Sequence, residues 1–196
     1  MSGSFPTSPP ANQISVKSVT PTLVSVTHSL KRQVRARGGQ RWLLDVNFPP
    51  MTRAEFQPIW AFSVKQQGQY ESFTFTPPIV SQSSGGVVTH SVTTSSAAIG
   101  ATSVTIASLS GTLKAGDFIK FSGHDKVYML TADCASASSI AIEPALVAAV
   151  AGAETITWNS VPIKVAFASD LREFSTGAGK GNNILFSYSM SLIETP

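Results

Sequence analysis

The last segment of the chain restricts its fold most, because residues 184–193 (ILFSYSMSLI) alternate apolar and small polar side chains over the length of a strand. Phe186, Tyr188 and Met190 share one face, and serines occupy the other. A strand of this kind has one face to bury and needs a neighbouring strand on each open edge. Its partner must come from earlier in the chain, and we expect an early hairpin to supply it.

That hairpin is predicted from two segments with alternating patterns. Residues 23–34 (LVSVTHSLKRQV) place apolar residues and His28 at period two, and residues 41–48 (RWLLDVNF) alternate in the same way. Gly38-Gly39 provides a turn that tolerates positive φ. Pro49-Pro50 ends the second strand, because proline donates no ladder hydrogen bond.

A helix is predicted directly after these prolines. Thr52 and Glu55 have the spacing of a capping box, in which each side chain satisfies a free backbone N–H group of the other residue. The segment 52–67 then reads as an amphipathic helix, kinked at Pro58 and closed at Gly68. Its expected apolar stripe comprises Phe56, Ile59, Trp60, Ser63 and Val64.

The composition changes after Pro77-Pro78. Residues 81–98 are small, polar and interrupted by glycine, which indicates an exposed edge strand or a loop. Short strands separated by turn signals follow, which is typical of a compact β-barrel or small sandwich. The expected strands are 103–107, 117–121, 126–131, 139–142 and 154–158.

These patterns predict a discontinuous organisation. Residues 14–79 plus 160–196 form a β-sandwich domain flanked by the helix, and residues 80–159 form a small β-barrel-like domain inserted between its strands. Residues 1–13 are rich in Ser and Pro and are expected to be a flexible N-terminal arm or an extended strap. The fold class is therefore mainly β with one helix.

Composition excludes several classes of protein. A single cysteine leaves no disulfide framework, and a net charge of +3 is mild for a nucleic-acid-binding domain. The longest apolar run, residues 144–152, is far shorter than the ~20 residues that cross a bilayer. We expect a protein that is soluble when made, compatible with a reducing cytoplasm, with no membrane partner and no specific nucleic-acid binding.

The residues offer no arrangement for catalysis. The three histidines, His28, His90 and His124, are far apart in sequence and have no second ligand at metal-binding spacing. Asp117, Asp125 and Asp133 lie among turns but lack the dense spacing of a calcium loop. We therefore expect no enzyme activity, no metal and no cofactor.

The most unusual feature is a run of basic residues without an intervening acid. Lys31, Arg32, Arg35, Arg37 and Arg41 fall around the predicted tip of the hairpin. A protruding basic hairpin suits an acidic protein surface, nucleic acid or simply solvent. Base-stacking aromatic residues are missing apart from Trp42, so an acidic protein partner is the favoured functional interpretation.

The order of strap, basic hairpin, helix, inserted β module and final strand resembles the distal tail protein of long-tailed bacteriophages. The likeness is carried by residues 24–48, 52–67 and 70–75 (YESFTF), with residues 114–131 and 140–146 similar to modules of phage tail and baseplate proteins. The resemblance implies a virion protein of the tail tip that is assembled in the host cytoplasm.

The same resemblance implies a ring, expected to be hexameric, that joins the tail tube to the tip or baseplate hub. The implied partners are further copies of the chain, the tail tube protein, the tip hub protein and, as a further candidate, the tape measure protein. The basic hairpin residues are then candidates for the subunit interface.

Two alternatives remain open at this stage. The chain could be a tail tube subunit, which shares a related sandwich-and-helix plan. Alternatively, the inserted domain could bind carbohydrate on the host surface, with Tyr128 and Trp158 as the large flat side chains available for stacking on a sugar.

Overall fold

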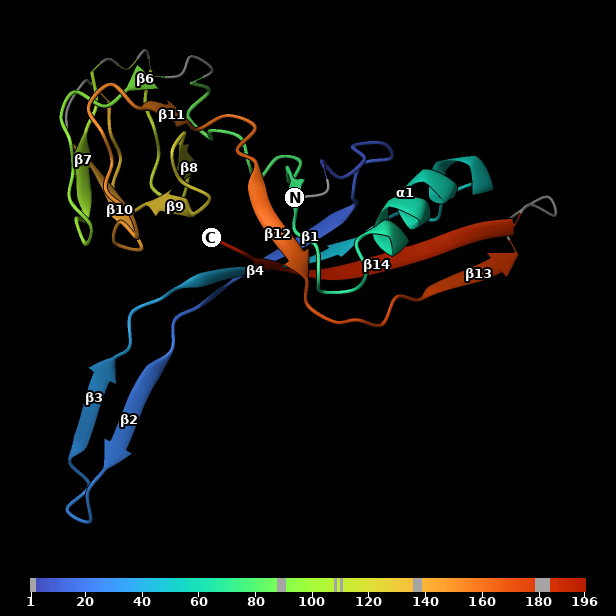
Figure 1. Ribbon diagram of the computed structural model, residues 1–196, viewed down its shortest axis with the longest axis horizontal. Coiled ribbons are helices and arrows are strands. Elements are labelled where there is room, and N and C mark those ends of the chain that lie inside the picture. The colour runs from blue at the N-terminus through green and yellow to red at the C-terminus, as the bar shows by residue number, and fades with distance from the viewer. Residues whose placement is uncertain (1–2, 88–90, 108, 110, 136–138, 179–183) are drawn as a thin grey trace.

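The computed structural model describes residues 3–87, 91–107, 109, 111–135, 139–178 and 184–196. Figure 1 shows these residues as a main sheet covered by a helix, a smaller curled sheet to one side, and a hairpin that projects away from both. Among the described residues there is one helix, and the remaining elements are strands. The predicted fold class, mainly β with one helix, is confirmed.

The main sheet joins the two ends of the chain. Its strands lie in the order β1-β4-β14-β12-β5, and β13 pairs with part of β14. The last strand runs antiparallel to β4, with Met190 opposite Val46 and Leu192 opposite Leu44. The bounds are β1 Gln13–Val19, β4 Arg41–Asn47, β5 Phe73–Phe75, β12 Ile163–Phe167, β13 Phe174–Ala178 and β14 Ile184–Glu194.

Helix α1 (Arg53–Lys65) covers one face of this sheet (Figure 1). The Thr52 backbone N–H donates to Glu55 Oε2 at 2.8 Å, as the capping box predicts. This hydrogen bond, with a second one from the Thr52 hydroxyl, holds the pKa of Glu55 below its ordinary value. The buried face of the helix carries Phe56, Ile59 and Ser63, whereas Val64, predicted in the same stripe, is exposed.

The N-terminal segment is an ordered strap, and the prediction of a flexible arm is wrong for residues 3–12. The Phe5 N–H donates to the Thr74 carbonyl at 2.8 Å, and the Thr74 N–H donates to the Gly3 carbonyl at 2.9 Å. Phe5 is buried in the main core beside Phe48 and Phe75. The apolar gain of burying this one aromatic side chain, ~1.5–3 kcal/mol, explains why a polar, proline-rich segment stays on the body.

The smaller sheet is formed by the middle of the chain and has its own core. Its strands lie in the order β6-β11-β8-β9-β10-β7 and curl around Phe121, Tyr128 and Trp158. The bounds are β6 Ser91–Val92, β7 Ser103–Thr105, β8 Phe118–Phe121, β9 Val127–Leu130, β10 Ser139–Glu143 and β11 Thr155–Thr157. Each strand expected here is present, with ends that differ by a few residues.

Gly85 is a sensitive point of this smaller sheet. A Cβ atom at Gly85 would lie 1.7 Å from the Thr112 carbonyl oxygen, a backbone atom that cannot move aside freely. We expect Gly85→Ala to destabilise the protein by ~1–3 kcal/mol, as overpacking does. The matched control is Gly177→Ala in β13, where the added methyl group meets nothing within 4 Å. Urea unfolding of both variants measures the effect, and equal stability of the two would contradict this packing.

The hairpin differs from its prediction. Residues 23–34 are not one continuous strand, because β2 (Thr22–Val26) turns at residues 27–31 and pairs with β3 (Arg32–Ala36). Gly38 and Gly39, predicted at the tip, both have positive φ and lie where the hairpin rejoins the body. The tip is therefore about ten residues earlier than the glycine pair suggested. We call β2, β3 and the connecting residues 27–31 the arm.

Candidate interaction surface: the exposed arm

The arm has no packing partner in the described chain. Every residue of β2 and β3 is exposed, and the main core contains no residue from either strand. Each of its two strands has five residues and spans roughly 17 Å, and Figure 1 shows the arm pointing away from both sheets. An isolated hairpin is marginally stable in water, so an arm of this length is expected to gain its stability from a surface outside the subunit.

The tip of the arm is held in a defined turn. The Leu30 N–H donates to the Thr27 carbonyl at 2.8 Å, and the Thr27 N–H donates to the Lys31 carbonyl at 3.1 Å. Leu30 has φ +61° and its side chain is 84% exposed. His28, predicted to pack on a sheet face, instead lies exposed in this turn. The turn thus presents an apolar side chain at the far end of the arm.

The two faces of the arm differ in chemistry. Val24 is opposite Val34, and Val26 is opposite Arg32, which places these side chains on one face because directly paired residues point the same way. We call this the apolar face of the arm. The other face carries Leu23 opposite Arg35 and Ser25 opposite Gln33. Exposed valines on one face of a ribbon mark it as a surface for association.

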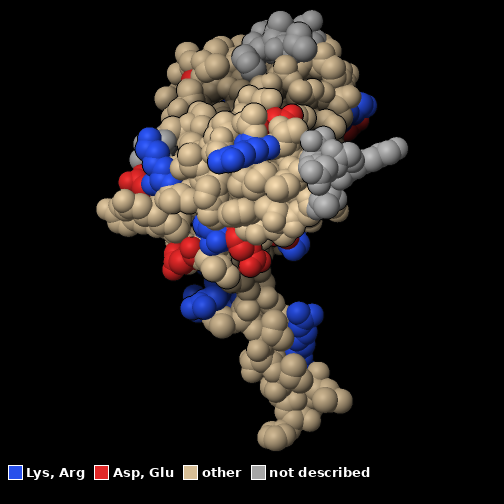
Figure 2. Space-filling view, turned by 90° about the vertical axis from the view of Figure 1, so that its right-hand side faces the viewer, with Lys and Arg blue, Asp and Glu red and all other residues tan. Residues whose placement is uncertain are grey.

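The basic residues run along the arm and do not gather at one point. Lys31 belongs to the tip, Arg32 and Arg35 to β3, Arg37 to the root, and Arg41 begins β4. Figure 2 shows Lys and Arg side chains on the arm and Asp and Glu side chains at the end of the body from which the arm leaves. The arm is therefore a basic extension, and the end of the body from which it leaves carries charges of both signs.

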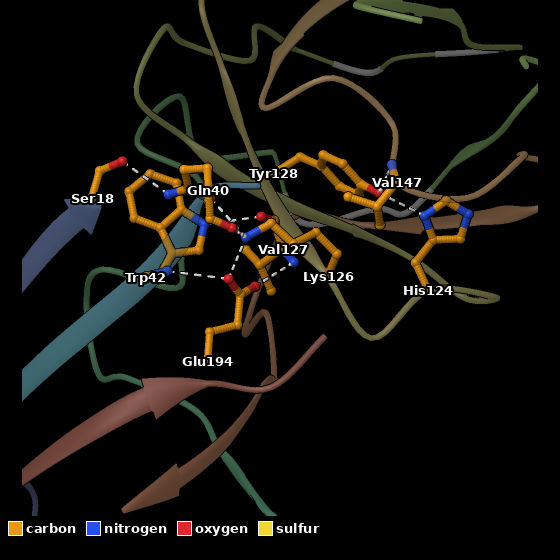
Figure 3. A network of polar contacts seen from close by, with 9 residues as sticks. All are labelled: Ser18, Gln40, Trp42, His124, Lys126, Val127, Tyr128, Val147 and Glu194. Atoms are coloured by element: carbon orange, nitrogen blue, oxygen red, sulfur yellow. Dashed lines mark hydrogen bonds and ion pairs between the residues drawn. The ribbon is translucent and has the colours of Figure 1, made fainter. Parts of the chain in front are cut away.

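A buried polar network fixes the root of the arm (Figure 3). The Gln40 side-chain amide donates to Ser18 Oγ on β1 at 2.9 Å. The Lys126 ammonium donates to the Gln40 carbonyl at 2.8 Å, to Gln40 Oε1 at 2.7 Å, and to Glu194 Oε2. Its three hydrogens are all used, which is what a buried ammonium requires.

Glu194 links the last strand to the middle of the chain. Its carboxylate accepts the Val127 N–H at 2.9 Å and the Trp42 N–H at 3.2 Å, and the Trp42 indole N–H donates to the Val127 carbonyl at 2.9 Å. Burial lowers the pKa of Lys126, and the hydrogen bond and charge of Glu194 oppose that shift. The network thus ties β4, β9 and β14 together at the point where the arm begins.

Tyr128 and Trp158 do not face solvent, so the prediction that they contact a saccharide is wrong. Their exposed fractions are 0% and 1%, and both lie in the core of the smaller sheet. The Tyr128 hydroxyl lies 2.8 Å from Nδ1 of the buried His124. Tyr128 lies in β9 and Trp158 directly follows β11, and both large side chains fill the space that the curved sheet encloses.

The three aspartates of the middle segment each contact a lysine residue. Asp117 accepts the Lys114 N–H at 3.0 Å, Asp125 pairs with Lys164 at 2.6 Å, and Asp133 pairs with the Lys114 ammonium at 2.8 Å. Within the ranges that the structure describes, no three His, Cys, Asp or Glu side chains are grouped to hold a metal ion. His90 lies outside the described residues.

Comparison with known proteins gives one family match, in the middle of the chain. Residues 81–161, less than half of the chain, match the family described as the B domain of the distal tail protein pb9. These residues contain all of the strands from β6 to β11. Comparison with curated proteins gives no match. Within the described part of the chain, no helix has the length and apolar character needed to cross a membrane.

Proposed function

We propose that this chain has a structural role in a phage tail and forms the ring that joins the tail tube to the tip hub, a proposal supported by the match of residues 81–161 to the B domain of a distal tail protein. We propose a hexamer, placed in the virion at the tail tip and assembled in the host cytoplasm. Its partners would be further copies of itself, the tube protein, the hub protein and, as a further candidate, the tape measure protein.

The exposed arm is the observation that carries this proposal. Its valines and Leu30 are largely exposed in the single chain, and its hydrogen bonds are those of one unsupported ladder. An arm that extends from one side of a body makes a contact between unlike surfaces of two copies, and such contacts close into a ring when the rotation between copies permits. Lys31, Arg32, Arg35, Arg37 and Arg41 are the proposed interface residues of this arm.

We further propose that residues 14–79 plus 160–196 form the ring and that residues 80–159 are an inserted domain. The sheet order supports this division, because strands from both outer segments pair with one another in one sheet and strands of the middle segment form the other. Two largely separate cores support it as well. The role is mechanical, and we propose no catalysis for either part.

Electron microscopy of the purified chain tests the proposed ring. The expected result is isolated rings of uniform diameter with the inserted domains on their rim. Long filaments would favour the alternative of a tail tube subunit, in which rings stack without limit. Particles of single-subunit size at every concentration used would contradict the ring.

A further inference from the structure

A second exposed surface lies on the body, where two loops are fixed against each other. The Gln69 N–H donates to Asp170 Oδ1 at 3.0 Å. Gly68 approaches so closely that a Cβ atom there would lie 2.6 Å from the same oxygen. Tyr70 and Leu171 follow directly in the two loops and are 80% and 70% exposed. The contact therefore holds two large apolar side chains in solvent, at the edge of the main sheet.

The surface beside Leu171 is acidic. Asp170 and Glu173 are exposed in the same loop. The intervening Arg172 turns inward, with its guanidinium carbon 3.7 Å from the centre of the Phe167 ring, and donates to the Ser169 carbonyl. Its charge is thus directed at the body, whereas the two carboxylates are left at the surface.

A groove continues from this loop onto the sheet. Leu171, Arg172 and Glu173 line the groove from this loop, and Asp45, Ser189 and Ser191 of β4 and β14 line it from the sheet. Asp45 is already paired with Lys17 at 2.5 Å and accepts the Ser191 hydroxyl at 2.6 Å. Glu173 is therefore the carboxylate of this groove that is placed to meet a further cation. We call Tyr70, Leu171, Glu173 and this groove the receiving surface.

The geometry points to one occupant for the receiving surface, the apolar face of the arm of a second copy of this chain. The receiving surface carries the exposed Tyr70 and Leu171 near the carboxylate of Glu173, and the apolar face of the arm carries valines near Arg32, so the two match in both polarity and charge. This inference rests on the proposed ring and adds to it the surface that each arm contacts.

The pattern on the arm assigns the pairing. Arg32 shares its face with Val34 and Val26, whereas Arg35 points to the opposite face. On a strand, residues two apart on one face are roughly 7 Å apart. Leu171 and Glu173 are likewise two residues apart in the chain, and both line the groove. We place Val34 against Leu171 and Arg32 beside Glu173. The arm cannot contact the receiving surface of its own subunit, because it points away from the body of that subunit (Figure 1).

A charge exchange in the full chain tests this pairing. We expect Glu173→Lys alone and Arg32→Glu alone each to raise the dissociation constant of the oligomer at least 10-fold, because each sets like charges against each other. The double variant Glu173→Lys with Arg32→Glu restores the pair in opposite order and should recover most of the affinity. The matched control is Glu143→Lys, the same charge change at an exposed carboxylate of the inserted domain. Analytical ultracentrifugation measures all four.

Cross-linking provides a second readout that does not depend on affinity. With Val34→Cys and Leu171→Cys in one chain, a short bismaleimide should link successive subunits into a ladder, and each single variant should give no ladder. Wild type controls for Cys134, which is buried. Assembled rings with no ladder and no effect of Glu173→Lys would overturn the inference and leave the ring intact. A chain that stays monomeric at all concentrations would overturn the ring as well.

Discussion

Removing the arm is expected to give a folded monomer. Val19 is paired with Arg41 across β1 and β4, so deletion of residues 21–37 leaves Thr20, Gly38, Gly39 and Gln40 as a four-residue loop between paired residues. Such loops are common in hairpins, and both glycines already have positive φ. No core side chain is lost and Gln40 keeps its place in the network. We expect an unchanged melting temperature for the monomer and loss of the oligomer by light scattering.

Two matched double variants separate a specific contact from a general effect on the arm. Val24→Asp with Val34→Asp puts two charges on the apolar face, and Ser25→Asp with Gln33→Asp puts the same charges on the other face. Two valines buried at an interface contribute roughly 3 kcal/mol or more, so the first variant should weaken assembly on the order of 100-fold. The second should assemble nearly as wild type does. Equal effects of the two variants would contradict the assignment of the apolar face.

The second large effect is expected at Glu194. Glu194→Gln leaves the Lys126 ammonium buried without a carboxylate, and breaking a buried ion pair in this way costs ~3–5 kcal/mol. Urea unfolding of the variant near neutral pH should show a loss of this size. Because the network joins β4, β9 and β14, the loss should affect the whole chain, with one transition moved to lower urea.

The pH dependence follows from the lowered pKa of Lys126. In the folded chain that pKa lies below its ordinary value of 10.5, so at high pH the unfolded chain binds more protons and stability rises with pH. Glu194 opposes the shift, and its removal lowers the pKa of Lys126 further. The deficit of Glu194→Gln should therefore be smaller at about pH 9.5 than at about pH 7.

A double variant controls for the other contacts of Glu194. Lys126→Met with Glu194→Gln removes the buried cation, and the amide oxygen can still accept a backbone N–H. It should be more stable than Glu194→Gln alone, and its stability should rise less with pH, because only Lys120 keeps a lowered pKa among the lysines. A double variant that is less stable than Glu194→Gln would mean that the ammonium is not the source of the loss.

The sequence predicted the elements that depend on local pattern. The alternation of residues 184–193 and the need of a terminal strand for a neighbour led to its pairing with β4. The capping box placed the start of α1 within one residue. In both cases a short-range rule and the global fold agree, and such agreement makes a local pattern informative.

The arm was predicted as a basic hairpin, but its tip was misplaced. The turn at residues 27–31 contains no glycine or proline, and Leu30 adopts positive φ there. Gly38-Gly39 was a stronger turn signal than residues 27–31, but these two glycines form the bend at the root of the arm. β13 was missed because its segment combines Phe174 with small residues and shows no clear alternation.

The network at the arm root was invisible in the sequence. Lys126, Glu194 and Gln40 are distant from one another along the chain, and each alone reads as a surface residue. Their burial follows only from the meeting of the two sheets. For Tyr128 and Trp158 the difficulty was different. Each fell in a predicted strand, and the pattern did not decide whether its side chain is buried or exposed.

The mass of the full chain in solution tests the central claim, that the arm serves to join copies of this chain. Light scattering across a wide range of concentration should give a single assembled species of about six times 20.6 kDa, and the mass should fall as Glu173→Lys or the arm deletion is introduced. A constant mass of 20.6 kDa, with an arm that stays exposed at the highest concentration, would contradict the account.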